Sequence, residues 1–123
     1  MEGKAAAKSF QDLVVWRKAH ELVISVYRLS DMFPRAELFG LTSQLRRSAV
    51  SVPANIAEGF RKRGRADKGR YLNIAHGSLD EVLYLLILAN DLGYAETSVF
   101  RAQAEEVGRM LGAYYHAILD SRF

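Results

Sequence analysis

Apolar residues recur every three or four positions through nearly the whole chain. In the first stretch, Val15, Ala19 and Leu22 show this spacing. Four stretches have this period: about residues 11–32, 37–61, 66 or 70–90, and from 97 or 98 onward. The period places apolar side chains on one side of an α-helix, and no stretch shows the alternation of a β-strand. The sequence therefore predicts an all-α protein with four amphipathic helices.

Short connections between these stretches predict an antiparallel, up-down-up-down four-helix bundle. Phe33-Pro34 ends the first helix, because the residue before a proline is pushed out of helical geometry. Pro53 lies inside the second stretch, where it removes a backbone donor and crowds the carbonyl of Ala49. We expect a kink there, since the apolar rhythm continues in phase. The alternative is a break, with Ser51 capping a new helix.

The length and composition of the chain fit one small globular domain. Half of its 123 residues are apolar, and we place the bundle at residues 10–123, after a disordered segment at residues 1–9. The chain has no cysteine, which excludes thiolate chemistry and fits a reducing cytoplasm. The N-terminus lacks the apolar stretch of a secretory signal, and the longest apolar run is too short to cross a bilayer. We therefore expect a soluble, cytoplasmic protein without membrane contact.

The longest apolar run, residues 82–89, reads VLYLLILA and is apolar on every face of a helix. A bundle helix normally keeps one face in water, so such a helix is buried on more than one side. Either the helix lies at the centre of a tight bundle, or its outer face contacts another subunit. We favour a homo-oligomer, with an interface formed by Leu83, Tyr84, Leu85, Ile87 and Leu88.

Positive charge is concentrated between residues 46 and 70. This segment has an excess of +6, whereas the whole chain has a net charge of +3. Arginine forks suit phosphate oxygens, and such contacts bind a backbone without reading its bases. The alternative is a solvated turn. We predict that a basic loop at residues 61–70 binds the backbone of structured RNA or duplex DNA. The binding residues would be Arg61, Lys62, Arg63, Arg65, Lys68 and Arg70.

Several motifs resemble those of a known protein family. They are DLVVWRKAHEL near the start, FP at 33–34, ELFGLTSQLRRSAVSVPANIAEG and YLNIAHGSLDE. Over roughly residues 10–120 the chain resembles four-helix bundle proteins encoded in intervening sequences of bacterial 23S ribosomal RNA genes. That family is similar to the accessory variability proteins of diversity-generating retroelements, which are pentameric, bind nucleic acid and partner a reverse transcriptase. The resemblance implies a closed, five-subunit ring, but the function of most family members is not established.

The resemblance also places the family motif on polar residues that interrupt apolar stretches. Buried polar side chains need partners, so we expect a hydrogen-bonded network between the second and third helices. Arg47 with Glu58 or Glu81 would be its charged part, and the alternative is a binding pocket. The network residues are Gln44, Arg47, Ser51, Asn55, Glu58, Ser78 and Glu81.

One pair of residues raises the possibility of an enzyme. Arg70 and His76 resemble the short Arg-to-His motif of small helical ribonucleases, where the histidine activates a ribose hydroxyl. That motif usually has a polar residue where this chain has Tyr71, so we favour a structural role for His76. No Glu-x-x-His pair suits a di-iron site. We therefore expect a non-enzymatic protein without metal or cofactor, whose alternative function is a scaffold for an acidic protein partner.

Overall fold

The computed structural model describes residues 6–120, and this part of the chain is helical without any strand. The α-helices are α1 (Val14–Ser30), α2 (Leu41–Arg61), α3 (Arg65–Asp91) and α4 (Ser98–Asp120). Short 3₁₀ helices, η2 (Phe10–Asp12) and η3 (Arg35–Glu37), precede α1 and α2. The predicted all-α class with four helices is confirmed.

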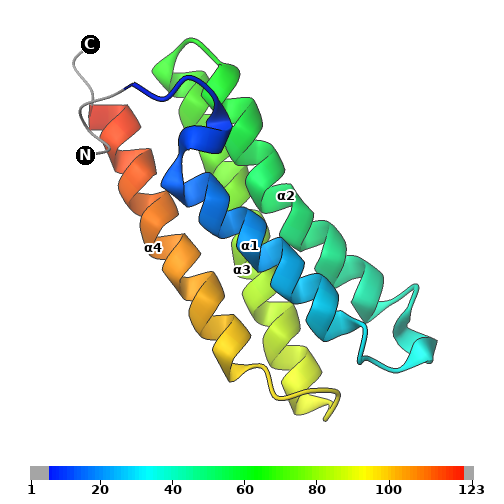
Figure 1. The fold of residues 1–123 in the computed structure, drawn as a ribbon. Helices are drawn as coiled ribbons and strands as arrows, with labels where there is room; N and C mark the ends of the chain where they lie inside the picture. The colour runs from blue at the N-terminus through cyan, green and yellow to red at the C-terminus, as the bar shows by residue number, and fades with distance from the viewer. Residues whose placement is uncertain (1–5, 121–123) are drawn as a thin grey trace.

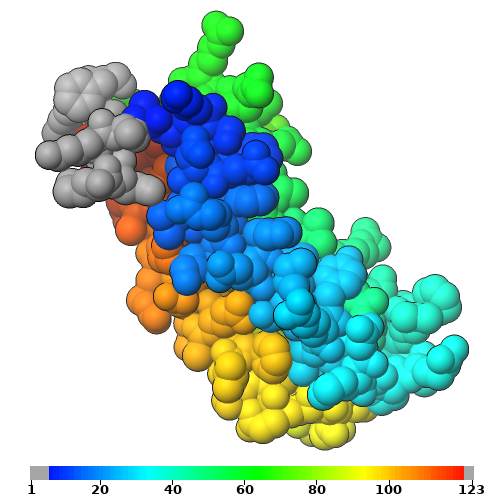
Figure 2. Space-filling model, viewed as in Figure 1, coloured from blue at the N-terminus to red at the C-terminus, as the bar shows by residue number. Residues whose placement is uncertain are grey.

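The four helices lie side by side (Figure 1). The most extensive contact is between α2 and α3, and α1 packs against both α2 and α4. The α2–α3 connection lies at the same end of the molecule as η2 and the end of α4 (Figure 1). The α1–α2 and α3–α4 connections lie at the opposite end, and the space-filling view shows an elongated molecule (Figure 2).

All four helices contribute to one apolar core. Leu22, Leu45, Ile56, Leu86 and Leu111 are fully buried, which accounts for the apolar period of each stretch. Four apolar residues that continue this period are only half-buried: Phe60, Phe100, Tyr114 and Ile118. The core therefore follows the predicted rhythm through the middle of each helix and opens towards the ends.

A local cap orders the chain before α1. The backbone N–H groups of Lys8 and Ser9 donate to Asp12 Oδ2, at 2.8 and 3.2 Å. These two hydrogen bonds lower the pKa of the Asp12 carboxyl. Lys8 and Ser9 belong to the segment expected to be disordered, whereas residues 1–5 of that segment lie outside the described residues.

The second apolar stretch, residues 37–61, forms the end of η3 and the whole of α2, and α2 is not interrupted at its proline. η3 ends at Glu37, and α2 begins four residues later, because Glu37 Oε1 accepts a hydrogen bond from the Leu41 N–H at 3.0 Å. α2 then runs through Pro53 without interruption. The alternative of a break with a cap at Ser51 is therefore wrong, and the kink stays a prediction.

α3 is, by length and composition, apolar enough to cross a membrane, and no other helix within residues 6–120 is. This finding is weak support for a span, because core helices of soluble proteins pass the same test. In this bundle α3 packs against both α2 and α4. Its apolar residues Leu72, Leu79 and Leu86 are buried in the core.

Glu37 makes the start of α2 sensitive to acid. Its carboxylate accepts hydrogen bonds from Leu41 N–H and from the Tyr94 hydroxyl at 2.7 Å, and both lower the pKa of Glu37 below its ordinary 4.5. A carboxyl with a lowered pKa stabilises the fold above its unfolded-state pKa, and this contribution is lost as the pH falls through the folded-state pKa. We expect acid to lower the urea midpoint of the wild type more steeply than that of Glu37→Gln. Parallel profiles would contradict this role.

Candidate nucleic-acid interface

The basic stretch is mostly helical. Arg61 is the last residue of α2 and Arg65 the first of α3, so only residues 62–64 form the connection. The predicted basic loop at residues 61–70 was therefore wrong in its extent. Gly64 occupies the N-cap position of α3, and the following residues, RADKGR, continue the helix. The side chains of this connection project from the end of the molecule, where it is coloured green (Figure 2).

Five basic side chains lie in this short connection and on the two helix ends that flank it. Arg61, Arg63, Arg65 and Arg70 are exposed, and Lys62 is half-buried. Together we call them the cationic end: Arg61, Lys62, Arg63, Arg65 and Arg70. Arg61, Arg65 and Arg70 lie on α2 and α3, so the packing of these two helices sets their relative positions.

The contacts of the cationic end leave most of its charge in water. Arg70 pairs with Asp67 at 3.5 Å, but both side chains are more than half exposed, so the pair contributes little stability. Lys62 Nζ and the Arg70 guanidinium lie 5.1 and 4.8 Å from the centre of the Tyr71 ring. Within residues 6–120, no salt bridge or side-chain hydrogen bond holds Arg61 or Arg63. These two arginines are therefore the cations whose guanidinium groups are most available to donate hydrogen bonds to an anion.

Lys68 differs from the other predicted cations because its charge serves the fold. Its Nζ donates to the carbonyl of Phe60 at 2.8 Å and to that of Gly59 at 3.4 Å. These carbonyls are at the C-terminal end of α2, where helical partners are lacking. Burial lowers the pKa of the Lys68 ammonium. Lys68 therefore joins the start of α3 to the end of α2, and we do not include it in the cationic end.

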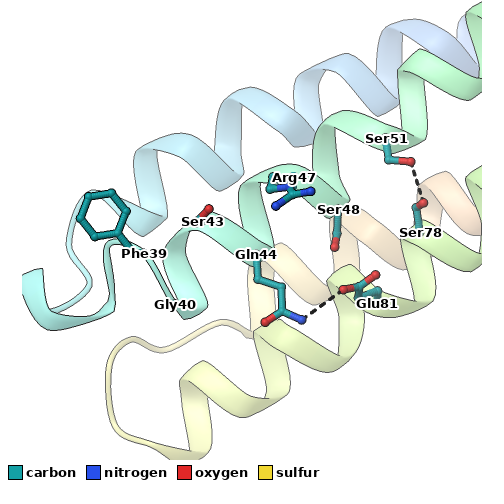
Figure 3. A pocket seen from close by; sticks show the side chains of 9 residues that line it. All are labelled: Phe39, Gly40, Ser43, Gln44, Arg47, Ser48, Ser51, Ser78 and Glu81. Carbon is teal, nitrogen blue, oxygen red and sulfur yellow. Dashed lines mark hydrogen bonds between the residues drawn. The ribbon is translucent and has the colours of Figure 1, made fainter.

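An open groove lies between α3 and the first half of α2 (Figure 3). Five of the seven expected network residues line it: Gln44, Arg47, Ser51, Ser78 and Glu81. Ser51 Oγ and Ser78 Oγ are 2.8 Å apart, and Asn55 Nδ2 donates to Ser51 Oγ at 3.0 Å. Gln44 Nε2 donates to Glu81 Oε2 at 3.4 Å. The groove has a volume of about 570 Å³ and is polar, because hydroxyl and amide groups line it.

The charged part of the network differs from the prediction. Arg47 and Glu81 line the same groove from opposite helices, yet no salt bridge joins them within residues 6–120 (Figure 3). Glu58 lines a different groove, with Phe10 and Arg61. Arg47 and Glu58 are eleven positions apart on one helix, a rise of about 16 Å that no pair of side chains spans. The expected Arg47–Glu58 pairing was therefore wrong.

The predicted subunit interface divides between core and surface. Leu85 is only 3% exposed and belongs to the core of its own bundle, so its assignment to the interface was wrong. Leu83 and Leu88 are half-buried against that core. Tyr84 and Ile87 remain, 59% and 42% exposed. We call Tyr84, Ile87 and the exposed part of Leu88 the outer α3 face.

Arg70 and His76 do not share a site. Arg70 lines a groove at the start of α3, whereas His76 lines another with Asp80 and Glu105. His76 faces two glycines of α4, since a Cβ on Gly108 would be 4.0 Å from its Nε2. This contact supports the structural role for His76. Among residues 6–120, no group of three His, Cys, Asp or Glu could hold a metal ion.

Sequence reasoning missed an aromatic residue beside the cationic end. Tyr115 of α4 packs next to Gly69 of α3, because a Cβ on that glycine would be 3.4 Å from Tyr115 Cε1. The position of Tyr115 could have been inferred from the expected order of the helices in the bundle. In a bundle with short connections, the end of the fourth helix lies beside the start of the third.

Comparisons with known proteins agree with this fold. Residues 11–113 match the 23S rRNA-intervening sequence protein family. A crystal structure of a protein of unknown function from the S23 ribosomal protein family of Bacteroides thetaiotaomicron is similar, with a TM-score of 0.76 and 26% identity. The similarity covers 84% of this chain and 96% of that chain. No functionally curated protein matches the chain. Because the family match spans most of its length, the chain belongs to the 23S rRNA-intervening sequence protein family, whose function is unknown.

Proposed function

We propose that this protein binds the phosphate backbone of RNA or DNA through the cationic end, as a non-enzymatic homo-oligomer. The observation that supports the proposal most is the gathering of five cations at one end of the molecule. Three lie near the adjoining ends of α2 and α3, and two lie in the three-residue connection between them. Phosphates that pair with these cations release counterions, which gives affinity without base readout.

The electrostatic balance around the cationic end favours an anionic ligand. Asp67 is its only acidic neighbour in the segment 61–70, and Glu58 lies near Arg61. Lys8 lines the same groove as Arg61 and adds another positive charge. Four of the five cations are arginines, whose planar forks can donate two hydrogen bonds to one phosphate.

The oligomeric part of the proposal rests on the outer α3 face. Two large apolar side chains, Tyr84 and Ile87, are exposed close together on one helix, and contact with a second copy would remove both from water. A closed ring would repeat the cationic end once per subunit and so multiply weak phosphate contacts. The resemblance to pentameric accessory variability proteins favours five subunits.

Charge reversal at the cationic end tests the binding site. We expect Arg61→Glu/Lys62→Glu/Arg63→Glu to weaken binding of a fluorescent RNA by at least about tenfold at low salt, because three phosphate contacts become repulsive. The slope of log affinity against log salt should shrink by roughly 0.7–0.9 for each phosphate that the variant no longer neutralises. The measurement is fluorescence anisotropy over a salt series.

A matched control separates this site from overall charge. Arg28→Glu/Arg35→Glu/Arg109→Glu changes the net charge equally at exposed positions elsewhere. We expect this control to bind RNA much more tightly than the cationic-end variant. Equal losses in both variants would show that total charge, and not this site, governs binding. If the wild type does not bind RNA but co-purifies with an acidic protein, the scaffold alternative is favoured.

A further inference from the structure

A second groove, of about 500 Å³, lies between the start of α3 and the end of α4, directly beside the cationic end. Its lining is mainly apolar and includes Ile74, Tyr115 and Leu119. Ile74 is 43% exposed and Leu119 38%, so apolar surface faces water here. Gly69 lets Tyr115 and Leu119 approach the backbone of α3, since its missing Cβ would be 3.4 and 3.3 Å from them.

Two members of the cationic end border this groove. Arg70 is part of its lining. Arg65 Nη1 donates to the Leu119 carbonyl at 3.4 Å, which places its guanidinium against the α4 side of the groove. Asn73, another lining residue, donates from its amide to the Tyr115 hydroxyl at 3.4 Å. Apolar surface, one aromatic ring, an amide and two cations therefore meet within a short distance.

We infer that this groove holds one unstacked nucleobase of a single-stranded RNA or DNA whose phosphates contact the cationic end. The inference rests on the proposed function and names the class of nucleic acid. A base has an apolar π-face that packs on aromatic and aliphatic side chains, and a polar edge that hydrogen-bonds with groups such as the Asn73 amide. A duplex keeps its bases stacked inside, so it can use the cations but not the groove.

Tyr115 is better placed for stacking than the aromatic residues closer to the connection. The Tyr71 ring already lies near Lys62 and Arg70, and Lys68 Nζ lies 5.5 Å from the centre of the Phe60 ring. The Tyr115 ring instead makes an edge contact with His116, at 5.6 Å and 73°. Within residues 6–120, no lysine or arginine lies over the Tyr115 ring, and this ring lines the same groove as Arg70.

The test compares RNA ligands that carry the same phosphates with and without bases. The probes are an unstructured 12-nucleotide RNA, an abasic oligomer of equal length and an RNA duplex, each measured by fluorescence anisotropy. We expect the wild type to bind the 12-nucleotide RNA about tenfold more tightly than the abasic oligomer, because stacking adds to the phosphate contacts.

Two variants locate this preference in the groove. Tyr115→Leu should lower affinity for the single strand about tenfold while leaving the abasic oligomer and duplex unchanged. Tyr115→Phe keeps the ring and should remain within about twofold of the wild type. Circular dichroism checks the fold of both variants. If Tyr115→Leu does not fold, the comparison of base-bearing and abasic ligands on the wild type decides.

The outcomes separate this inference from the proposed function. Equal wild-type affinity for base-bearing and abasic strands would overturn the base subsite, and salt-sensitive binding to the cationic end would still stand. A loss on Tyr115→Leu that is equal for the single strand and the duplex would also overturn the subsite. If none of the three nucleic acids binds, both proposals are overturned.

Discussion

Replacing Leu85 by alanine is expected to lower the free energy of unfolding by about 2–5 kcal/mol. Leu85 is 3% exposed and packs in the core, so truncation removes buried methyl groups and leaves a cavity. Neighbouring side chains from closely packed helices can collapse into such a space only in part. The measurement is urea denaturation followed by far-UV circular dichroism.

Ile87→Ala provides the matched control for this effect. Ile87 lies two residues further along α3 and is 42% exposed in the single chain, so we expect a loss below about 1 kcal/mol when both variants are measured at a dilution at which the proposed oligomer dissociates. Losses of similar size at both positions would contradict the division of α3 into a core side and an outer face. A Leu85→Ala effect that shrinks on dilution would instead assign this residue to a subunit contact.

Tyr84→Asp/Ile87→Asp is expected to convert the proposed oligomer into single chains that keep their helical content. Contact between copies would bury two carboxylates without partners in an apolar interface, which costs several kcal/mol per charge. A closed ring repeats that cost at every subunit boundary. Size-exclusion chromatography with light scattering at micromolar concentration measures the change.

Ile24→Asp/Val99→Asp controls for added negative charge, because these exposed residues belong to α1 and α4. We expect this control to keep the oligomeric state of the wild type. A wild type that is itself a single chain would overturn the oligomeric part of the proposal. Nucleic-acid binding would then rest on one copy of the cationic end.

Most of the fold could be predicted from the sequence because burial is periodic along every helix. Leu22, Leu45 and Leu86 each repeat the apolar rhythm of a helix that packs on one side. The start of α2 could not be predicted in this way. It depends on Glu37, whose carboxylate accepts hydrogen bonds from the nearby Leu41 N–H and from the Tyr94 hydroxyl. Tyr94 lies in a distant part of the chain, so the sequence pattern does not reveal this contact.

The candidate site was predictable only in its charge. An excess of cations is visible in the sequence, but the partners of each cation depend on packing. Lys68 bonds to the carbonyls that end α2, and Tyr115 reaches the cationic end from a helix more than forty residues away. Leu85 shows the same limit, since a run that is apolar on every face does not reveal which side chains turn inward.

The shortness of the α2–α3 connection has a consequence for how this chain tolerates insertions. Extra residues between positions 62 and 64 would shift Arg65 and Arg70 relative to Arg61 and move Lys68 away from the Phe60 carbonyl. The α2–α3 connection should therefore tolerate substitutions better than insertions.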